Sequence, residues 1–440
     1  IVEPAEVYDF LTADRRPLLR VGRVGLGPSG WPQSSMFSQP ELEQVLFDRV
    51  AALPSVEVRR GVRVTGLVEE GDAVRLEGEG LDAGEPLRAR YVVGCDGANS
   101  TVRERLGLAM VDKAFFYDWL IVDVVFDEPR RYDPVNFQVC DPARPTTVVS
   151  GGPGRRRWEF MALPGETAEE LDDEAMAWRL LEPWDARPDN ATLERHAVYR
   201  FQARWLEEWR RGRVLLAGDA AHQTPPFAGQ GMCAGIRDAL NLAWKLHLVL
   251  RGRASHSLLD SYERERSPHV REILRGTLFL GARLRGDTRW QRWRRRTELR
   301  LIGALPPVQA LLRRAGLPRP RLRRGCLDER SPCHGHHLPQ VTVHHGGRDQ
   351  PSDDLLGYRF ALIVRPELVT PELLAWADAR AIAVLRPGAD FIDSTGALTA
   401  FLRAHALDFA LVRPDRQIFG AGPARALPRV QAALARQLAA

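Results

Sequence analysis

Hydrophobic and polar residues recur along the first part of the chain with two different periods. A stripe at helical spacing predicts a helix that begins near Pro40. Its apolar members are Leu42, Val45, Leu46 and Val50. Short runs with a period of two follow, and the last of them, residues 89–93, predicts a strand that leads into a glycine turn.

The middle of the chain predicts an antiparallel sheet. Apolar runs over 120–126, 146–150 and 158–163 are separated by turns rich in Pro and Gly, and a helical pattern over 169–181 follows them. A buried strand over 214–217 and a long helix over 232–250 come next, with more helix over 258–284. From residue 341 onward, strands and helices alternate, which predicts a small α/β domain.

Composition narrows the classes of protein that the chain can belong to. Of its 440 residues, 44% are hydrophobic and 27% are charged, with a formal net charge of +5. These values exclude a disordered, collagen-like or coiled-coil chain, and the length predicts two or three domains. Five scattered cysteines favour a reducing compartment, so we expect a cytoplasmic protein. No apolar run reaches the length of a membrane span. The oligomeric state stays open, and a homodimer is one alternative.

Two segments carry candidate chemistry. In the first, the strand over 89–93 delivers Asp96 and Gly97 at its carboxyl end, where open α/β sheets bind ligands. A plain helix cap by Asn99 or Ser100 explains this segment equally well. In the second, a buried strand delivers Asp219, and a loop with two prolines leads to a glycine-rich helix start over 229–231 that suits an anion.

Together these segments resemble the class A FAD-dependent aromatic hydroxylases, the para-hydroxybenzoate hydroxylase superfamily. The resemblance rests on Asp96-Gly97, on Gly218-Asp219 with His222, on the glycine-rich helix start, and on the run over 237–246. It is closest to the 3-(3-hydroxyphenyl)propionate hydroxylase branch. It implies an α/β fold: a Rossmann-like FAD/NAD(P)-binding domain, an inserted antiparallel substrate domain and a C-terminal thioredoxin-like domain. That last domain has no Cys-x-x-Cys.

The resemblance also implies domain bounds and cofactor contacts. The FAD-binding domain takes residues 1–112 and, with a helical bridge, 206–335, the substrate domain takes 113–205, and the thioredoxin-like domain takes 336–440. Asp219 is expected to bind the ribityl chain of FAD, and the helix start to hold the N1–C2 edge of the flavin ring. The full set expected at the cofactor is Gln39, Asp96, Gly97, Gly218, Asp219, Pro226, Gly229, Gln230, Gly231 and Met232.

The implied reaction is the hydroxylation of a phenol such as 3-(3-hydroxyphenyl)propanoate. NADH or NADPH reduces FAD, O2 forms a flavin C4a-hydroperoxide, and the phenol ring attacks it. We expect a proton acceptor near the substrate hydroxyl, but the sequence does not single out that residue. The candidates to line the substrate pocket are Tyr117, Trp119, Arg157, Phe160, Met161 and Pro225. Each can equally be an ordinary core or surface residue.

One element of the family is absent from the given sequence. The family begins with a strand, a Gly-x-Gly-x-x-Gly turn and a helix, which bind the FAD diphosphate. Residues 25–30 fit the glycine spacing, but Pro28, Trp31 and Pro32 oppose a helix start, so we interpret this segment as a loop. Either a longer natural chain or a relative with weakened FAD binding explains the absence, and the start at Ile1 favours the longer chain.

Other readings remain open. The fold can persist in a truncated binding protein without catalysis, or in a polyketide- or antibiotic-type flavin hydroxylase. An arginine- and tryptophan-rich run over 283–296 suggests a nucleic-acid or membrane surface, although such runs are usually solvated helix faces. Cys326, Cys333 and the histidines at 334, 336 and 337 fit no standard zinc spacing, so we expect no metal.

Overall fold

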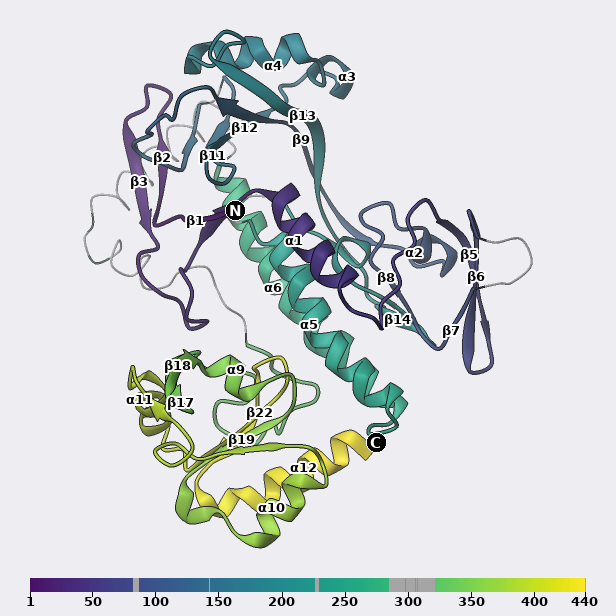
Figure 1. Ribbon diagram of the computed structural model, residues 1–440. Helices are drawn as coiled ribbons and strands as arrows, with labels where there is room; N and C mark the ends of the chain where they lie inside the picture. Colours follow the sequence, from purple (N-terminus) through teal and green to yellow (C-terminus); the bar gives the residue numbers. More distant parts are fainter. Residues whose placement is uncertain are drawn as a thin grey trace.

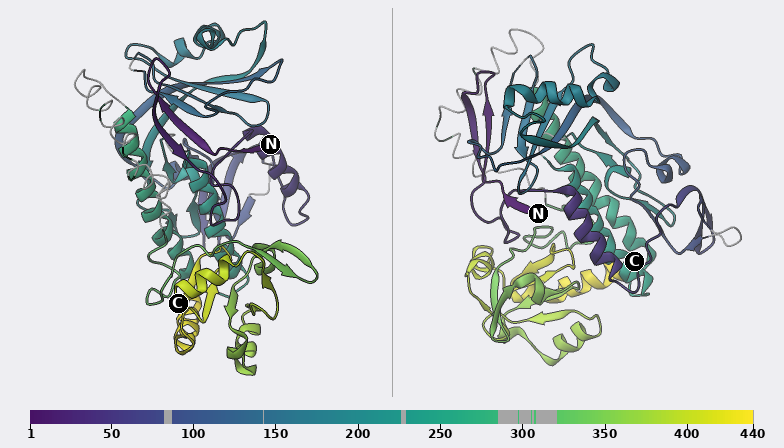
Figure 2. Two further views of the ribbon diagram at one scale, coloured as in Figure 1. Left: turned by 90° about the vertical axis from the view of Figure 1, so that its left-hand side faces the viewer. Right: turned by 45° about the horizontal axis from the view of Figure 1, so that its top comes forward.

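The computed structural model describes residues 1–81, 87–141, 143–225, 229–284, 297, 305, 307 and 321–439. Figure 1 shows a large sheet above a pair of long helices, with a smaller α/β unit below. Figure 2 gives two further views of this arrangement. None of the helices in these described ranges combines the length and the apolar character that a bilayer span requires.

The large sheet has eight strands drawn from distant parts of the chain. In spatial order they are β16 (His222–Gln223), β13 (Ala191–Trp205), β9 (Val111–Phe126), β12 (Arg155–Met161), β11 (Thr146–Ser150), β10 (Phe137–Val139), β2 (Val7–Leu11) and β3 (Pro17–Gly22). Only β10 and β2 pair in parallel. β2, β3 and β16 lie outside residues 113–205 and join this sheet by long-range pairing that leaves no local pattern in the sequence.

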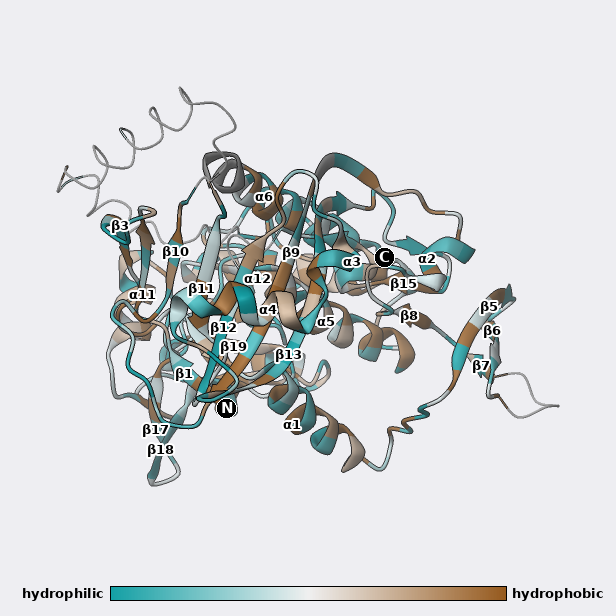
Figure 3. Cartoon of the chain, turned by 90° about the horizontal axis from the view of Figure 1, so that it is seen from above, coloured by the Kyte–Doolittle hydropathy of each residue, from teal (hydrophilic) through white to brown (hydrophobic). Residues whose placement is uncertain are grey.

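The two faces of this sheet differ in chemistry. α3 (Ala168–Leu171) and α4 (Glu174–Leu181) lie across one face (Figures 1 and 3), where Leu120, Val122, Trp158 and other apolar side chains form a core with α4. Side chains alternate along a strand, so the intervening residues point to the other side. We call this other side the inner face; its residues include Trp119, Ile121, Asp123, Gln138, Thr147, Arg157, Glu159 and Met161.

A small three-stranded sheet with one parallel pair carries the motifs at Asp96 and Asp219. β8 (Val92–Gly94) pairs in parallel with β15 (Val214–Leu216), and β14 (Arg210–Arg211) flanks β15. α2 (Thr101–Arg105) follows β8, and a three-stranded sheet of β5 (Arg63–Glu70), β6 (Ala73–Glu79) and β7 (Leu87–Ala89) lies nearby (Figure 1). In the described part of the chain, β8 is an edge strand of its sheet.

The helix predicted to begin near Pro40 is α1 (Gln39–Ala51), with Pro40 in its first turn, and it follows the β1 (Val2–Pro4) and β4 (Ser35–Phe37) pair. The prediction of the helix is confirmed. None of its residues is buried, however, and Val45 and Leu46 are 52% and 55% exposed. The apolar stripe of α1 thus lacks a covering surface among the described residues.

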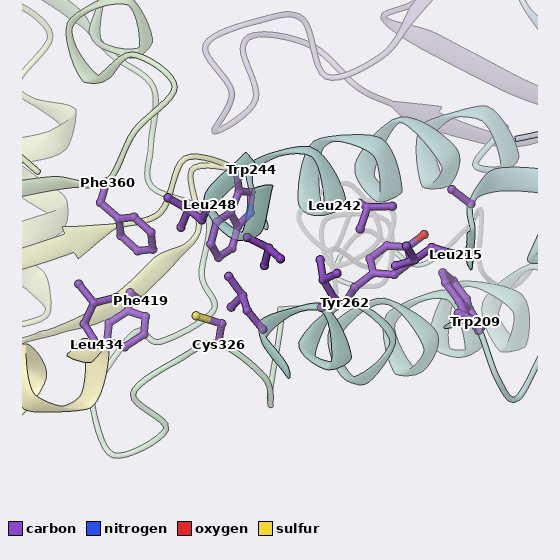
Figure 4. Close-up of a cluster of buried hydrophobic side chains, with 14 of the residues drawn as sticks. Trp209, Leu215, Leu242, Trp244, Leu248, Tyr262, Cys326, Phe360, Phe419 and Leu434 are labelled. Carbon is purple, nitrogen blue, oxygen red and sulfur yellow. The ribbon is translucent and has the colours of Figure 1, made fainter. Parts of the chain in front are cut away.

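Two long helices form the centre of the molecule. α5 (Gly231–Leu250) and α6 (Asp260–Leu284) pack together around Leu242 and Tyr262. Figure 4 shows this core continuing through Trp244 to Phe360 and Phe419 of the C-terminal unit. The ring centroids of Trp244 and Phe360 lie 5.5 Å apart, edge to face. The C-terminal unit is therefore joined to the helix pair by a continuous hydrophobic core.

The C-terminal unit contains a four-stranded sheet in the order β20 (Ala383–Leu385), β19 (Ala361–Val364), β22 (Phe409–Val412) and β23 (Ile418–Gly422). β19 and β20 are parallel, and the remaining pairs are antiparallel. α10 (Pro371–Asp378), α11 (Ala397–Ala404) and α12 (Leu427–Ala439) complete the alternation that the sequence predicts. A second sheet of β18 (Arg348–Pro351), β17 (Thr342–His345) and β21 (Ile392–Asp393), with α9 (Ser352–Leu356), lies beside it.

Candidate functional site

The two predicted motifs meet at one edge of the parallel pair. Because β8 and β15 run in the same direction, Asp96 and Asp219 leave the same end of the sheet. Ala217 N donates to Gly94 O at 3.0 Å, which joins the two strand ends. Gly218 adopts a φ of +61°, a conformation that favours glycine and turns the chain sharply before the exposed Asp219.

The buried carboxylate of Asp238 on α5 fixes the turn at Gly218 through hydrogen bonds. Its Oδ2 accepts hydrogen bonds from Gly218 N at 3.1 Å and from His222 Nε2 at 2.6 Å. Its Oδ1 accepts from Arg266 Nε of α6 at 2.7 Å. Burial acts to raise the pKa of Asp238, but the hydrogen bond from His222 and the charge of Arg266 outweigh it, so the pKa is lowered. The strand end and both helices are thus tied to one buried carboxylate.

The glycine-rich segment is the start of α5. Gly231 is the first helical residue, Gln230 is the N-cap, and Gly229 has a φ of +59°. The first turn of this 20-residue helix presents free N–H groups and a partial positive charge. Thr224 Oγ1, just before the loop, is buried and finds no partner in the described residues.

The carboxylate of Asp96 also has a structural role at the start of α2. Its Oδ1 accepts from Ser100 Oγ at 2.5 Å and its Oδ2 from Val102 N at 3.0 Å. Ser100 in turn is the N-cap of α2 and accepts from Arg103 N. The alternative reading of this segment as a helix cap is therefore confirmed for Ser100, and the carboxylate of Asp96 supports that cap.

The other predicted cofactor residues lie on several different elements. Gln39 opens α1, and its amide donates to Glu43 Oε1 at 2.9 Å. Gly97 has a φ of +78° with open space beside it, and Met232 is 44% exposed in the first turn of α5. Pro226 lies outside the described residues.

Four of the six predicted pocket residues lie on the inner face of the eight-stranded sheet. Trp119 and Met161 are cross-strand partners, Arg157 lies four residues before Met161 on β12, and Tyr117 lies two residues before Trp119 on β9. Phe160 requires a correction, because it points into the core beneath α4 on the opposite face. A strand that directs Met161 inward cannot direct its neighbour the same way. Pro225 is buried at the start of the loop that leads to α5.

Sequence reasoning missed most of the polar groups of the inner face. Arg157 binds Asp123 through Nε and Nη2 at 2.6 and 2.9 Å, and Arg195 Nη2 approaches the same carboxylate at 3.1 Å. Glu159 and Thr147 are direct cross-strand partners. The alternation Arg157-Trp158-Glu159-Phe160 is a signal that could have found Glu159, since it places both charged residues on one face.

Three further segments were singled out in the sequence: the glycine spacing over 25–30, the arginine-rich run and the Cys/His group. Residues 25–30 form a loop, as predicted, and Pro28 O accepts from Gln340 N at 2.8 Å. The arginine-rich run over 283–296 lies outside the residues whose side chains are described. Across the described ranges, no group of three His, Cys, Asp or Glu side chains could hold a metal ion, and Cys326 and Cys333 are free and buried.

Family models and known proteins match most of this chain. The FAD binding domain model matches residues 10–277, and the HcaD C-terminal domain model matches residues 335–437. The probable NADH-specific resorcinol 4-hydroxylase of Rhodococcus jostii is 35% identical, covering 94% of this chain and 78% of the relative. A 3-(3-hydroxy-phenyl)propionate/3-hydroxycinnamic acid hydroxylase of Mycolicibacterium gilvum is 34% identical, covering 98% and 79%.

Solved structures agree on the fold. The flavin-dependent monooxygenase PieE, in complex with FAD and substrate, has a TM-score of 0.77 at 22% identity, covering 98% of this chain and 86% of that one. Aklavinone-11 hydroxylase with FAD and aklavinone has a TM-score of 0.76 at 24% identity, covering 98% and 85%. The fold and site define a flavoprotein monooxygenase. The chain belongs to the family of FAD-dependent aromatic hydroxylases.

The residues present fit one half of FAD better than the other. The unpaired Thr224 hydroxyl, the free N–H groups of α5 and the exposed Asp219 carboxylate suit the flavin ring and its ribityl chain. For the diphosphate half, the described residues offer no glycine turn between a strand and a helix beside β8. The described residues therefore fit the flavin end of FAD, and its diphosphate end has no matching turn among them.

Proposed function

We propose that this protein hydroxylates a phenol that carries a carboxylate side chain, of the 3-(3-hydroxyphenyl)propanoate class, next to the existing hydroxyl. It uses NADH or NADPH and O2, as the names of its relatives indicate for the reductant and the substrate class. The single observation that carries the substrate class is a pair of guanidinium groups on the inner face. Arg157 and Arg195 share the one carboxylate of Asp123, so this cluster of three side chains has one more cation than anion beside Glu159.

The cofactor contacts are part of the same proposal. Asp219 binds the ribityl chain, and the backbone N–H groups of Gly229, Gln230 and Gly231 hold the N1–C2 edge of the flavin ring, where a helix N-terminus stabilises negative charge. Gln39, Asp96, Gly97, Gly218 and Met232 border the site, with Pro226 beyond the described residues. When bound, FAD supplies the oxygen-activating and hydride-accepting chemistry, and the chain orients the phenol and excludes water.

The domain assignments also remain proposals. The exposed apolar stripe of α1 and the edge strand β8 support a Rossmann-like domain that a further strand–turn–helix unit completes for the FAD diphosphate. The order β20-β19-β22-β23, with one parallel and two antiparallel pairs, supports a thioredoxin-like C-terminal domain. Because residues 336–440 contain no cysteine, this domain has no thiol redox role.

Arg157→Met tests the carboxylate contact. We expect the KM for 3-(3-hydroxyphenyl)propanoate to rise about 10- to 100-fold, the loss of one hydrogen bond to a charged group. The kcat/KM for resorcinol, which has no carboxylate, should change little. Asp123 keeps Arg195 as a partner, so the fold should persist. Steady-state kinetics of substrate-dependent NADH oxidation by the FAD-loaded protein measure both values.

Arg200→Met is the matched control. Its guanidinium pairs with Asp118 on the same sheet but is 56% exposed. Its KM for both substrates should match the wild type. An equal loss for resorcinol and the propanoate in Arg157→Met would contradict a carboxylate contact. If resorcinol is the better substrate of the wild type, the substrate class is that of the Rhodococcus jostii relative instead.

A further inference from the structure

The inner face holds a carboxyl group that no ion pair in the described residues explains. Glu159 lies on β12, directly opposite Thr147 of β11 and Ile121 of β9. Its side chain is half-buried. The nearby guanidinium of Arg157 is bound in bidentate fashion to Asp123. A half-buried carboxyl without a cation of its own is costly unless it serves a ligand.

The groups around Glu159 are mostly neutral hydrogen-bonding groups. Thr147 faces it from β11, and Tyr8 faces it from β2. Arg157 on its own strand and Asp123 on β9 supply the nearest charges, of opposite sign. Burial and the charge of Asp123 raise the pKa of Glu159, and the charge of Arg157 and a hydrogen bond with Thr147 only partly offset this. A carboxyl with a raised pKa is a stronger base toward a phenol than an ordinary surface carboxylate.

The hydroxyl of Thr147 lies within hydrogen-bonding reach of both Gln138 and Glu159. Thr147 Oγ1 lies 2.6 Å from Gln138 Oε1, and a carboxylate has more than one lone pair, so Glu159 can accept from a further donor. Burial raises the pKa of Tyr8 as well, so the Tyr8 phenol stays protonated at neutral pH. The row Gln138–Thr147–Glu159 therefore ends in an acceptor with unused capacity.

The inner face also holds a buried donor that a ligand could use. Trp119 is 3% exposed, and its Nε1–H donor finds no partner in the described part of the chain. Trp119 pairs across the strands with Met161, one step from Glu159 on the same face. A buried indole N–H normally has a partner, so its free state points to a polar group that arrives with a ligand.

The strand register gives the position of Glu159 relative to the loop that leads to α5. This loop leaves the sheet from β16, and β12 is the third strand from it in the order β16-β13-β9-β12. At about 4.8 Å per strand, roughly 14 Å separate β16 and β12 across the sheet. Ile121, the partner of Glu159, pairs with Ala197, whereas His222 pairs with Trp205, so Glu159 also lies farther along the sheet from β16.

Resting on the proposed function, we propose that Glu159 is the proton acceptor for the phenolic hydroxyl of the substrate. The O–H bond of the phenol breaks, its electron pair stays on the phenolate oxygen, and the proton moves to a carboxylate oxygen of Glu159. The resulting neutral carboxyl returns the proton to solvent after product leaves. The phenolate ring is the more electron-rich nucleophile, so this step precedes hydroxylation.

Glu159→Gln is the test, because the amide keeps the shape and removes the base. In the FAD-loaded protein, we expect kcat/KM for 3-(3-hydroxyphenyl)propanoate at neutral pH to fall about 100-fold or more. The wild type should lose activity as pH falls through the pKa of Glu159. The variant should lack this acidic limb, and its rate should rise as pH approaches the ordinary phenol pKa of about 10.

A rescue separates a base from a merely structural residue. Ring-fluorinated analogues of the substrate have more acidic hydroxyls, and they should recover part of the lost rate in Glu159→Gln. Glu194→Gln, which removes an exposed carboxylate paired with Arg155 on the same sheet, is the control and should behave as the wild type. A loss in Glu159→Gln that is uniform across pH and across analogues would overturn the assignment, as would a loss below about threefold, roughly 0.7 kcal/mol.

A binding measurement keeps the outcome independent of turnover. 3-Hydroxycinnamate bound to the wild type should absorb at longer wavelength, because its hydroxyl donates to an ionised carboxylate. The shift should be present in Glu194→Gln and absent in Glu159→Gln. An identical shift in Glu159→Gln would overturn the role of Glu159. A wild-type shift without hydroxylation of any phenol would support that role and reject the proposed function alone.

Discussion

Replacing Arg413 with methionine is expected to lower the free energy of unfolding by about 3–5 kcal/mol, the cost of removing one partner from a buried ion pair. Arg413 lies on the turn between β22 and β23 and is fully buried. Its Nη2 donates to Glu265 of α6 at 2.7 Å and to Asp415 at 2.5 Å. The substitution leaves both carboxylates buried, and among the described residues only Lys245 remains as a cation paired with Glu265.

This ionic cluster joins the C-terminal unit to the helices that carry the site. Lys245 Nζ lies 2.9 Å from Glu265 and donates to Asn241 Oδ1 at 2.8 Å, both within the core between α5 and α6. Burial acts to raise the pKa of Glu265, but Arg413 and Lys245 outweigh it and lower the pKa to about 2. Burial lowers the pKa of Lys245 to about 8.

The pH dependence of stability follows from the depressed pKa of Glu265. The carboxylate is stabilised relative to the unfolded chain, whose ordinary value is 4.5. Its contribution is therefore fully present above about pH 4.5 and is lost as pH falls toward about 2. In Arg413→Met, the free energy of unfolding should depend less on pH below about 4.5, and it should also be lower at neutral pH.

Urea denaturation followed by tryptophan fluorescence, repeated across pH, measures both effects. Arg386→Met is the control, because its pair with Asp390 is exposed and should contribute less than about 1 kcal/mol. Equal stabilities for the wild type and Arg413→Met would show that the cluster does not hold the C-terminal unit in place.

Replacing Asp238 with asparagine is expected to weaken FAD binding at least tenfold, equivalent to about 1.4 kcal/mol. Three donors, Gly218 N, His222 Nε2 and Arg266 Nε, converge on this carboxylate. An amide has one acceptor oxygen and two donor hydrogens, so it cannot serve all three. The Gly218–Asp219 turn should lose its anchor, and the buried Arg266 its counter-charge.

The same substitution should destabilise the fold by about 3 kcal/mol, because it leaves a buried guanidinium without its carboxylate. Asp260→Asn is the control, since its pair with Arg210 is half exposed on the surface of α6. Fluorescence quenching of free FAD gives the affinity, and thermal unfolding gives the stability. Unchanged FAD affinity in a folded Asp238→Asn would mean that the turn does not need this anchor.

Local patterns in the sequence predicted the elements of the site well. The stripe from Leu42 to Val50 predicted α1, and the apolar run before Gly218 predicted β15. The sequence placed Asp96 and Asp219 each at the carboxyl end of a strand, and the parallel pairing of β8 and β15 brings the two motifs to one sheet edge. Each of these features is fixed by residues that are close together in the chain.

Features that depend on contacts between distant residues could not be predicted from the sequence. The pairing of β2 with β10 joins residues 7–11 to 137–139, and the bond from Arg413 to Glu265 spans 148 positions. The sequence alternation around Phe160 contained the correct facing, but the pocket prediction did not apply it. The residue proposed as the proton acceptor, Glu159, becomes visible only when β11 and β9 lie on either side of it.

The proposed hydroxylation is tested most directly by asking whether an atom of O2 enters the product in a single turnover. The full chain is loaded with FAD and given NADH, isotopically heavy O2 and 3-(3-hydroxyphenyl)propanoate, and the product is examined by mass spectrometry. We expect a dihydroxylated product that carries one heavy oxygen atom, formed in step with NADH consumption. NADH oxidation that yields only hydrogen peroxide for every phenol offered, or a protein that retains no flavin, would contradict the account.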